Sequence, residues 1–228
     1  MARPLGPEIS IHLEAYGAVY VEIPKVACTS IKSSLAALLG IPLENGNPHI
    51  TQFPFLEPQL ASARWYPDQF SFAFVRNPWD RLVSCYRDKI LGEVNGFTNF
   101  TDRPGVANCL AGFDEFTPGM TFDSFARAVC SIPDQDADPH FRSQHTFVAG
   151  ASADVSKRFA LNFVGRYESL AADLKQVESL SGLPDFALLR LQAATSRKRY
   201  QGFHTNHSLL EAVTKRFAAD IELFRYEF

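Results

Sequence analysis

Short apolar runs and helical spacings alternate along the first part of this chain. Residues 18–23 and 72–75 are apolar runs with the length of buried strands. Each run is followed by apolar side chains at helical spacing, over residues 31–39 and 79–86. Strands that alternate with helices predict an α/β fold, in which helices flank a central parallel sheet.

Three further helices are predicted later in the chain. Thr121 is a suitable N-cap for the first, and residues 170–177 belong to the second. The third begins at a capping box that runs from Ser208 to Glu211, and it continues to about Ala219. The apolar positions that define the first two helices are Phe122, Phe125, Ala126 and Val129, and then Leu170, Leu174 and Val177.

A long irregular segment separates these patterns. Residues 92–118 are rich in Gly, Asn, Asp and Pro, which disfavour a continuous helix. Loops of this length in a compact domain usually have a function, so we predict a substrate loop at about residues 92–120. Its aromatic side chains, such as Phe97, Phe100 and Phe113, either stack on a sugar or pack into a small satellite core. Packing is the favoured alternative for each of them.

The composition is that of a single globular domain spanning residues 1–228. The chain is 46% hydrophobic and 21% charged, and its 228 residues can bury a sizeable core. A formal net charge of −3 gives no global attraction to nucleic acid, so nucleic-acid binding is not expected. No stretch has the apolar length of a signal peptide or a membrane span.

Metal chemistry is not expected either. The cysteines are scattered without a CxxC pair or a Cys/His cluster of metal-binding spacing. We therefore expect reduced thiols and no bound metal. The four positions are Cys28, Cys85, Cys109 and Cys130.

The junctions after the two apolar runs have the chemistry of anion-binding sites. Residues 23–32 carry small residues, two hydroxyls and two lysines where a helix begins, so backbone N–H groups would face a phosphate or sulfate. After the second run, Pro78 suits a first helical turn. Arg76 then ends the strand side, and Ser84 lies about two turns into the helix. A guanidinium and a hydroxyl held in this way can share one phosphate.

These two segments resemble the cofactor-binding motifs of the carbohydrate sulfotransferases that use PAPS (3'-phosphoadenosine 5'-phosphosulfate). The segments read PKVACTSIK at residues 24–32 and FVRNPWDRLVSCYRDK at residues 74–89. Looser similarity at residues 139–144, 163–168 and 220–226 extends the likeness over nearly the whole chain. The resemblance, to the family 2 sulfotransferases of the chondroitin, dermatan and HNK-1 type, implies a P-loop-like strand-loop-helix for phosphosulfate, with PAPS as donor and PAP as product.

The resemblance also implies roles for individual residues. Lys25 is expected to neutralise the charge that develops on the leaving phosphate oxygen. Arg76 and Ser84 are expected to grip the 3'-phosphate, and Arg197 and Lys198 are a further cofactor contact in a basic and aromatic stretch. The residues expected around the 5'-phosphosulfate are Lys25, Val26, Ala27, Cys28, Thr29 and Ser30.

Two histidines are candidates for the base that removes the acceptor proton. A histidine has an ordinary pKa of about 6.5 and can accept a proton at neutral pH. His49 is favoured because it lies between the two cofactor motifs, where sulfotransferases commonly place a base. His140 belongs to a segment that resembles an HWxPQ-like motif of the family, so shaping the substrate wall is at least as suitable a role for it. A purely structural role is the alternative for each histidine.

Two other functions compete with sulfuryl transfer. A P-loop small-molecule kinase shares the strand-loop-helix phosphate cradle, but its GxxxxGK[ST] loop needs glycines, and residues 24–32 contain none. A non-catalytic nucleotide- or glycan-binding domain would need Arg76 and Ser84, but it would need neither Lys25 nor a nearby histidine. Sulfuryl transfer from PAPS therefore remains the leading hypothesis.

The resemblance also leads to expectations about the acceptor and the cellular location. The acceptor is a hydroxyl-bearing molecule, with a glycan or glycolipid expected, while the oligomeric state is left open. Animal members of the family are Golgi-luminal and carry an amino-terminal membrane anchor. Because the chain begins with a native-looking Met1 and lacks an apolar anchor, we expect a bacterial-type cytoplasmic enzyme. A Golgi lumen location is expected only if such an anchor has been removed.

Overall fold

The computed structural model describes residues 9–55, 69–93, 105–148, 161–184 and 200–228. Contacts within the chain divide it into two compact units. The sheet unit comprises residues 5–76 and 144–194, and the helical unit comprises residues 77–143 and 195–228 together with residues 1–4. The prediction of one domain over the whole chain stays a prediction.

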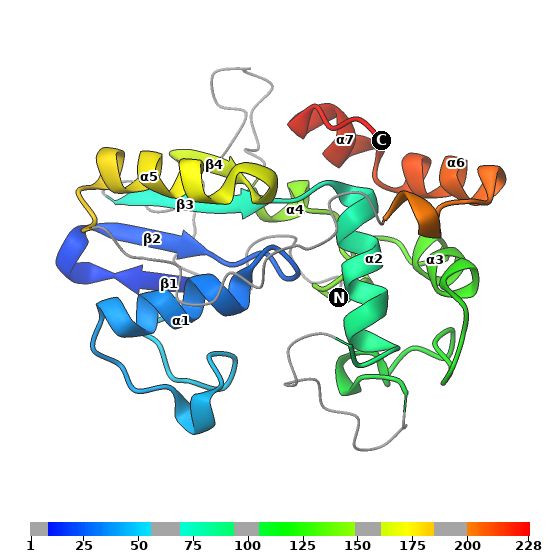
Figure 1. Ribbon diagram of the computed structural model, residues 1–228, viewed down its shortest axis with the longest axis horizontal. Helices are drawn as coiled ribbons and strands as arrows, with labels where there is room; N and C mark the ends of the chain where they lie inside the picture. The colour runs from blue at the N-terminus through cyan, green and yellow to red at the C-terminus, as the bar shows by residue number, and fades with distance from the viewer. Residues whose placement is uncertain (1–8, 56–68, 94–104, 149–160, 185–199) are drawn as a thin grey trace. The chain divides into compact units, whose positions relative to one another are not determined.

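The sheet unit is built on four strands in the order β1-β2-β3-β4 (Figure 1). Strands β2 and β3 are parallel, as predicted, and β4, which was not predicted, pairs parallel with β3. Strand β1, also not predicted, is an antiparallel edge strand beside β2. The predicted α/β fold is therefore confirmed, with a mixed sheet. The strands are β1 (Ser10–Leu13), β2 (Ala18–Val21), β3 (Phe70–Val75) and β4 (Phe163–Arg166).

Helices of the sheet unit bury apolar side chains at helical spacing. Helix α1 (Cys28–Leu38) buries Ile31 and Leu35, and helix α5 (Leu170–Ser181) packs along β3 and β4 (Figure 1). All three apolar positions predicted for α5 are buried, which confirms its predicted face. The other elements among the described residues of this unit are α4 (His145–Val148) and the short 3-10 turns η1 (Glu14–Tyr16), η2 (Glu44–Gly46) and η6 (Tyr167–Ser169).

The helical unit begins at the second predicted motif. Helix α2 (Pro78–Lys89) has Pro78 in its first turn, and the Asn77 side chain accepts hydrogen bonds from the backbone N–H groups of Trp79 and Asp80. An N-cap of this kind satisfies donors that the helix itself leaves unpaired. The predicted apolar face of this helix is confirmed as buried. Its members are Trp79, Leu82, Val83 and Tyr86.

Of the other helices of this unit, the first matches its prediction, whereas the predicted last helix differs at its start and along its length. Helix α3 (Phe122–Ser131) is capped by Thr121 as predicted. The predicted last helix is instead two helices, α6 (His207–Arg216) and α7 (Ala218–Phe224), and Asn206 rather than Ser208 is the N-cap. The Asn206 carboxamide oxygen accepts the Leu209 N–H, and it also accepts the Ser208 hydroxyl, so Ser208 supports the cap. The described part of this unit also contains the 3-10 turns η4 (Asn108–Leu110) and η7 (Gln201–Phe203).

Part of the predicted substrate loop packs into the core of the helical unit. The Phe113 ring lies 5.7 Å from the Phe116 ring and 5.6 Å from the Phe141 ring, centroid to centroid. Phe116 is fully buried, so this aromatic group forms the small core that was favoured over sugar stacking. Phe97 and Phe100 lie outside the described residues. A substrate role for residues 92–120 stays a prediction.

The structure bears on the expectations about the cysteines and about membrane-spanning helices. None of the four cysteines forms a disulfide, and the expected reduced state stays a prediction. Within the described ranges, none of the helices combines the length and apolar character that crossing a bilayer requires.

We predict that Gly165→Ala destabilises the protein because the Phe74 ring of β3 already fills the space that a side chain at this position of β4 would need. A Cβ at Gly165 would lie 2.6 Å from Cε1 of the buried Phe74 ring. Such overpacking typically costs about 1–3 kcal/mol, and each kcal/mol lowers the Tm by about 2–4 °C in a protein of this size. The Tm can be measured by calorimetry.

The matched control for this prediction is Gly112→Ala, because a Cβ at Gly112 meets no heavy atom within 4 Å. We expect this variant to change the free energy of unfolding by no more than about 0.5 kcal/mol. Equal melting temperatures for the two variants would contradict the assigned packing of the Phe74 ring over Gly165.

Candidate functional site

The turn between β2 and α1 adopts an unusual backbone conformation. Lys25 and Ala27 have φ values of 70° and 55°, in the left-handed region that favours glycine. Ala27 is the N-cap of α1, and its side chain makes no capping hydrogen bond. Backbone turns of this type, next to a helix N-terminus, form concave surfaces lined by N–H groups that bind anions.

The turn takes this conformation without glycine. Residues 24–32 contain no glycine, which counts against the triphosphate-binding loop of a P-loop kinase, yet Lys25 and Ala27 adopt the conformation for which glycine is usually needed. Each costs roughly 1–3 kcal/mol of backbone strain, which the surrounding structure has to offset. Val26 is buried between them and anchors the turn in the core.

A buried ion pair lies directly beside this turn. Lys32 on α1 donates from Nζ to Oε2 of Glu22 at 3.1 Å, and both side chains are 5% exposed. The second lysine of the junction is therefore engaged within the protein rather than directed at a ligand. Burial raises the pKa of the neighbouring Cys28 thiol, and the Glu22 carboxylate raises it further. Cys28 is thus a neutral thiol at neutral pH.

The structure brings one candidate base to the predicted phosphosulfate loop. Nε2 of His49 and Oγ1 of Thr29 are hydrogen bonded at 2.8 Å, although 20 residues separate them in the sequence. The backbone N–H of His49 donates to the Asn47 side chain, which fixes the turn that carries the imidazole. His49 is exposed and Ser30 is buried.

Arg76 joins the second motif to the first. Its Nη1 donates to the backbone carbonyl of Lys25 at 3.1 Å, and its guanidinium carbon lies 4.2 Å from the centroid of the Tyr167 ring. The Arg76 backbone is hydrogen bonded to the side-chain amide of Gln144 through both its N–H and its carbonyl. The sheet unit therefore brings four predicted residues together. Lys25 lies in the turn after β2 and Thr29 lies at the start of α1, and these two are contacted by Arg76 and His49 respectively.

The remaining predicted cofactor residues are not joined to this group. Ser84 lies half-buried on α2 in the helical unit, so its pairing with Arg76 stays a prediction. Arg197 and Lys198 lie outside the described residues.

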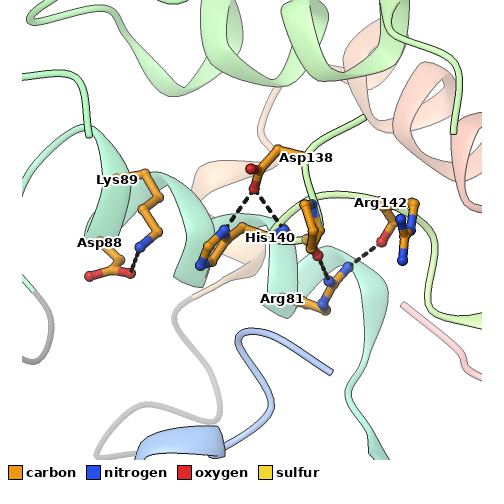
Figure 2. Close-up of polar contacts among 7 residues, drawn as sticks. Arg81, Asp88, Lys89, Asp138, His140 and Arg142 are labelled. Atoms are coloured by element: carbon orange, nitrogen blue, oxygen red, sulfur yellow. Dashed lines mark hydrogen bonds and ion pairs between the residues drawn. The ribbon is translucent and has the colours of Figure 1, made fainter. Parts of the chain in front are cut away.

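His140, the second candidate base, is held by a compact set of polar contacts in the helical unit (Figure 2). Its Nδ1 lies 2.6 Å from Oδ1 of Asp138, which also accepts the His140 backbone N–H. The buried Arg81 side chain donates to the carbonyls of Pro139 and Arg142, so it clamps the segment on both sides of His140 (Figure 2).

Two groups of side chains could in principle ligate a metal within the described ranges. One contains Glu22, Cys28 and His49, and the other contains Cys109, Asp138 and His140. Burial, together with Asp138, raises the pKa of Cys109 to about 11, which opposes the thiolate that a metal requires. The expectation of no bound metal stays a prediction.

Sequence reasoning missed the residues that support the site. Glu22 lies one residue beyond β2, and nothing in the sequence marks it as the partner of Lys32. Gln144 and Tyr167 lie in segments with the looser resemblance to the family. That resemblance draws attention to the segments, but it does not indicate what either side chain does. Asp138 stands two residues before His140, and this short spacing is the one local clue to their contact.

Comparison with known proteins settles the class of this chain. The family model described as "Sulfotransferase family" matches residues 11–227. The chain belongs to the sulfotransferase family. The residues that define the two cofactor motifs lie within this match, so the resemblance drawn from them is confirmed.

Curated relatives are carbohydrate sulfotransferases. The chain is 29% identical to carbohydrate sulfotransferase 14 of Mus musculus and 28% identical to that of Homo sapiens, in each case over 93% of this chain and 58% of the relative. It is 25% identical to carbohydrate sulfotransferase 11 of Mus musculus, over 86% of this chain and 60% of the relative. The chain thus spans about three fifths of the length of these relatives. No solved structure matches it.

The expectation of a bacterial-type cytoplasmic enzyme is wrong. The relatives are vertebrate carbohydrate sulfotransferases, the Golgi class that the family resemblance had set against it. That expectation rested on Met1 and on the lack of an apolar anchor in the sequence. The chain spans only part of the length of its relatives, so neither observation bears on the location.

We predict that Lys32→Met destabilises the fold strongly, because it leaves the Glu22 carboxylate buried without its partner. Breaking a buried ion pair from one side typically costs about 3–5 kcal/mol, whereas replacing both charges is close to neutral. The double variant Glu22→Gln with Lys32→Met should therefore recover most of the loss. Urea denaturation gives the free energy of unfolding for each variant.

Lys175→Met is the control for the loss of a lysine, because Lys175 is 60% exposed in its pair with Glu178. Its effect should stay within about 0.5 kcal/mol. If Lys32→Met is no more destabilising than this control, the Glu22–Lys32 pair does not support the turn.

Proposed function

We propose that this chain is a PAPS-dependent sulfotransferase that transfers the sulfuryl group of PAPS to a hydroxyl of a carbohydrate. The observation that carries the proposal is the meeting of the two motifs in the sheet unit, where Arg76 donates to the Lys25 carbonyl. The Arg76 guanidinium thereby lies against the left-handed turn that carries Lys25, next to a helix N-terminus. This is the donor set that a nucleotide with two separate anionic groups requires.

In this proposal the turn holds the donor at its 5'-phosphosulfate. The backbone of Val26, Ala27 and Cys28 and the hydroxyls of Thr29 and Ser30 supply hydrogen-bond donors. Lys25 supplies the positive charge. Arg76, together with Ser84, Arg197 and Lys198, accounts for the remaining anionic contacts, in particular the 3'-phosphate. The proposal requires no metal, because cationic side chains and backbone N–H groups face the anion.

The reaction is an in-line displacement at sulfur. The acceptor oxygen forms a bond to sulfur while the bond between sulfur and the phosphate oxygen breaks, and negative charge develops on that oxygen. Lys25 stabilises this charge as it develops, which is the type of interaction that accelerates a reaction rather than merely tightening binding. PAP leaves as the product, and the acceptor proton goes to a base.

His49 is the proposed base. Its contact with Thr29 places an imidazole beside the proposed phosphosulfate loop, within the same unit of the structure. A base of this kind contributes about 10²–10⁴-fold to the rate. His140, which is held by Asp138, is the second candidate and has the alternative role of shaping the substrate wall.

The proposed acceptor is a glycan or glycolipid hydroxyl. The printed names of the relatives specify carbohydrate sulfotransferases, and their class gives no support to a kinase. A silent binding domain is the remaining alternative, and turnover separates it from an enzyme.

The proposed function predicts that the protein transfers ³⁵S from labelled PAPS to desulfated glycosaminoglycans, and that Lys25→Ala lowers kcat far more than PAPS affinity. Removing one preorganised donor to a developing charge typically costs about 10²–10³-fold in kcat. Lys175→Ala, on the exposed face of α5, should keep wild-type kcat.

Absence of both label transfer and PAP binding in the wild-type protein would refute the proposed function. If transfer occurs and Lys25→Ala retains its kcat, the function holds but Lys25 does not stabilise the leaving group.

The assignment of the base predicts a distinct pH dependence. A neutral imidazole accepts the proton, so kcat of the wild-type protein should fall as pH decreases through the ordinary imidazole range of about 6–7. His49→Ala should lower kcat by about 10²–10⁴-fold and remove this acidic limb while PAP binding is kept. Rates at saturating PAPS and acceptor over a pH series measure the effect.

The exposed His207 gives a matched control, because its side chain is 85% exposed on α6. His207→Ala should keep the wild-type pH profile. An acidic limb that survives in His49→Ala and disappears in His140→Ala would transfer the role of base to His140.

A further inference from the structure

The side chain of Gln144 extends the sheet by one residue beyond the end of β3. That strand ends at Val75, which is paired with Arg166 of β4. At the next residue, the backbone N–H of Arg76 donates to Oε1 of Gln144 at 2.9 Å, and Nε2 of Gln144 donates to the Arg76 carbonyl at 2.8 Å. A carboxamide has the same donor and acceptor as a peptide group, so Gln144 takes the place of a strand partner.

The side-chain amide of Gln144 is buried, and burial strengthens its two hydrogen bonds to the Arg76 backbone. Gln144 is 0% exposed, so water does not compete for the backbone groups of Arg76. The pairing fixes the backbone of Arg76 where the chain leaves the sheet, and it therefore sets the direction in which the side chain begins.

The guanidinium end of Arg76 is fixed separately. Nη1 donates to the Lys25 carbonyl at 3.1 Å, and the planar group lies over the Tyr167 ring, 4.2 Å from its centroid. Tyr167 begins η6, directly after β4, so the ring is carried by the strand that pairs with β3. An aromatic face attracts a guanidinium and restricts its plane without occupying its N–H donors.

Preorganisation of this kind has a direct consequence for binding. Arginine has a long flexible side chain, and ordering it on a ligand reduces the affinity that its contacts provide. An arginine whose backbone, plane and terminal group are already fixed loses less freedom when an anion binds.

We propose that Gln144 and Tyr167 are positioning residues that hold Arg76 for recognition of a 3'-phosphate, and that they thereby set the preference of this chain for 3'-phosphorylated nucleotides. The inference rests on the proposed function, in which Arg76 contacts the 3'-phosphate of PAPS and PAP. Neither residue is assigned a contact with the nucleotide.

The test compares two nucleotides that differ only in the 3'-phosphate. Calorimetric titration gives Kd values for PAP and for adenosine 5'-monophosphate, and their ratio reports the 3'-phosphate contribution alone. The wild-type protein should favour PAP by at least about 100-fold, and Arg76→Ala should remove most of this preference. Gln144→Leu and Tyr167→Leu should each reduce the ratio by about tenfold, with the adenosine 5'-monophosphate Kd changed by less than about twofold.

Conservative and matched variants separate positioning from general stability. Tyr167→Phe keeps the aromatic face and should keep the wild-type ratio. Ser71→Ala removes a buried hydroxyl of β3 that is bonded to Asn162 and not to Arg76, so it should lower the Tm without changing the ratio. Because Tyr167 is only half-buried, Tyr167→Leu keeps the test available if Gln144→Leu fails to fold.

A double variant tests whether Gln144 acts through Arg76. Arg76→Ala combined with Gln144→Leu should show the same ratio as Arg76→Ala alone, because the residue to be positioned is already gone. An additive further loss would overturn the inference, as would wild-type ratios in both Gln144→Leu and Tyr167→Leu. A reduced preference for PAP over adenosine 5'-monophosphate in Ser71→Ala would overturn the inference as well. A wild-type protein without a preference for PAP would refute the proposed 3'-phosphate site itself.

Discussion

Parallel pairing of β2 with β3 is the constraint on which the candidate site depends. The carboxyl ends of neighbouring parallel strands meet at one edge of a sheet, and the segments that follow them are brought together there. The turn after β2 carries Lys25, and the residue after β3 is Arg76. Strand pairing alone therefore converts two motifs, separated by about fifty residues of sequence, into neighbours. The contact between Arg76 and the Lys25 carbonyl is the local result of that pairing.

Much of this arrangement could be predicted from the sequence because both motifs follow strong apolar patterns. Strands β2 and β3 are continuous buried runs, and α2 has its apolar face and Pro78 in the expected places. Strand β1 was not predicted, since its four residues include Ser10 and His12 and show no run to detect. Strand β4 was not predicted either, because two of its four residues, Gly165 and Arg166, are not apolar and interrupt the pattern.

The supporting side chains could not be predicted, because their roles arise from tertiary contacts. Nothing near Gln144 in the sequence indicates that its amide pairs with a backbone 68 residues away. The two lysines of the first motif look equivalent in sequence, yet Lys32 belongs to a buried ion pair with Glu22. The N-cap of α6 is Asn206 rather than Ser208, because the Asn206 side chain accepts the Leu209 N–H while the Ser208 hydroxyl donates to Asn206. In each case the sequence gives the residue types, and packing decides which partner each one takes.

The pairing between Arg76 and Gln144 also has a consequence for the order in which the parts of the proposed site come together during synthesis. The turn after β2 and the whole of β3 precede Gln144 in the chain, and β4 with its Tyr167 follows still later. Contacts across such separations form slowly, because a long loop has to close before they do. A nascent chain that ends before residue 144 contains both cationic residues but neither of the groups that hold Arg76. The proposed recognition of a nucleotide would therefore be a property of the finished fold, acquired only when β4 and the segment that carries Gln144 have joined the sheet.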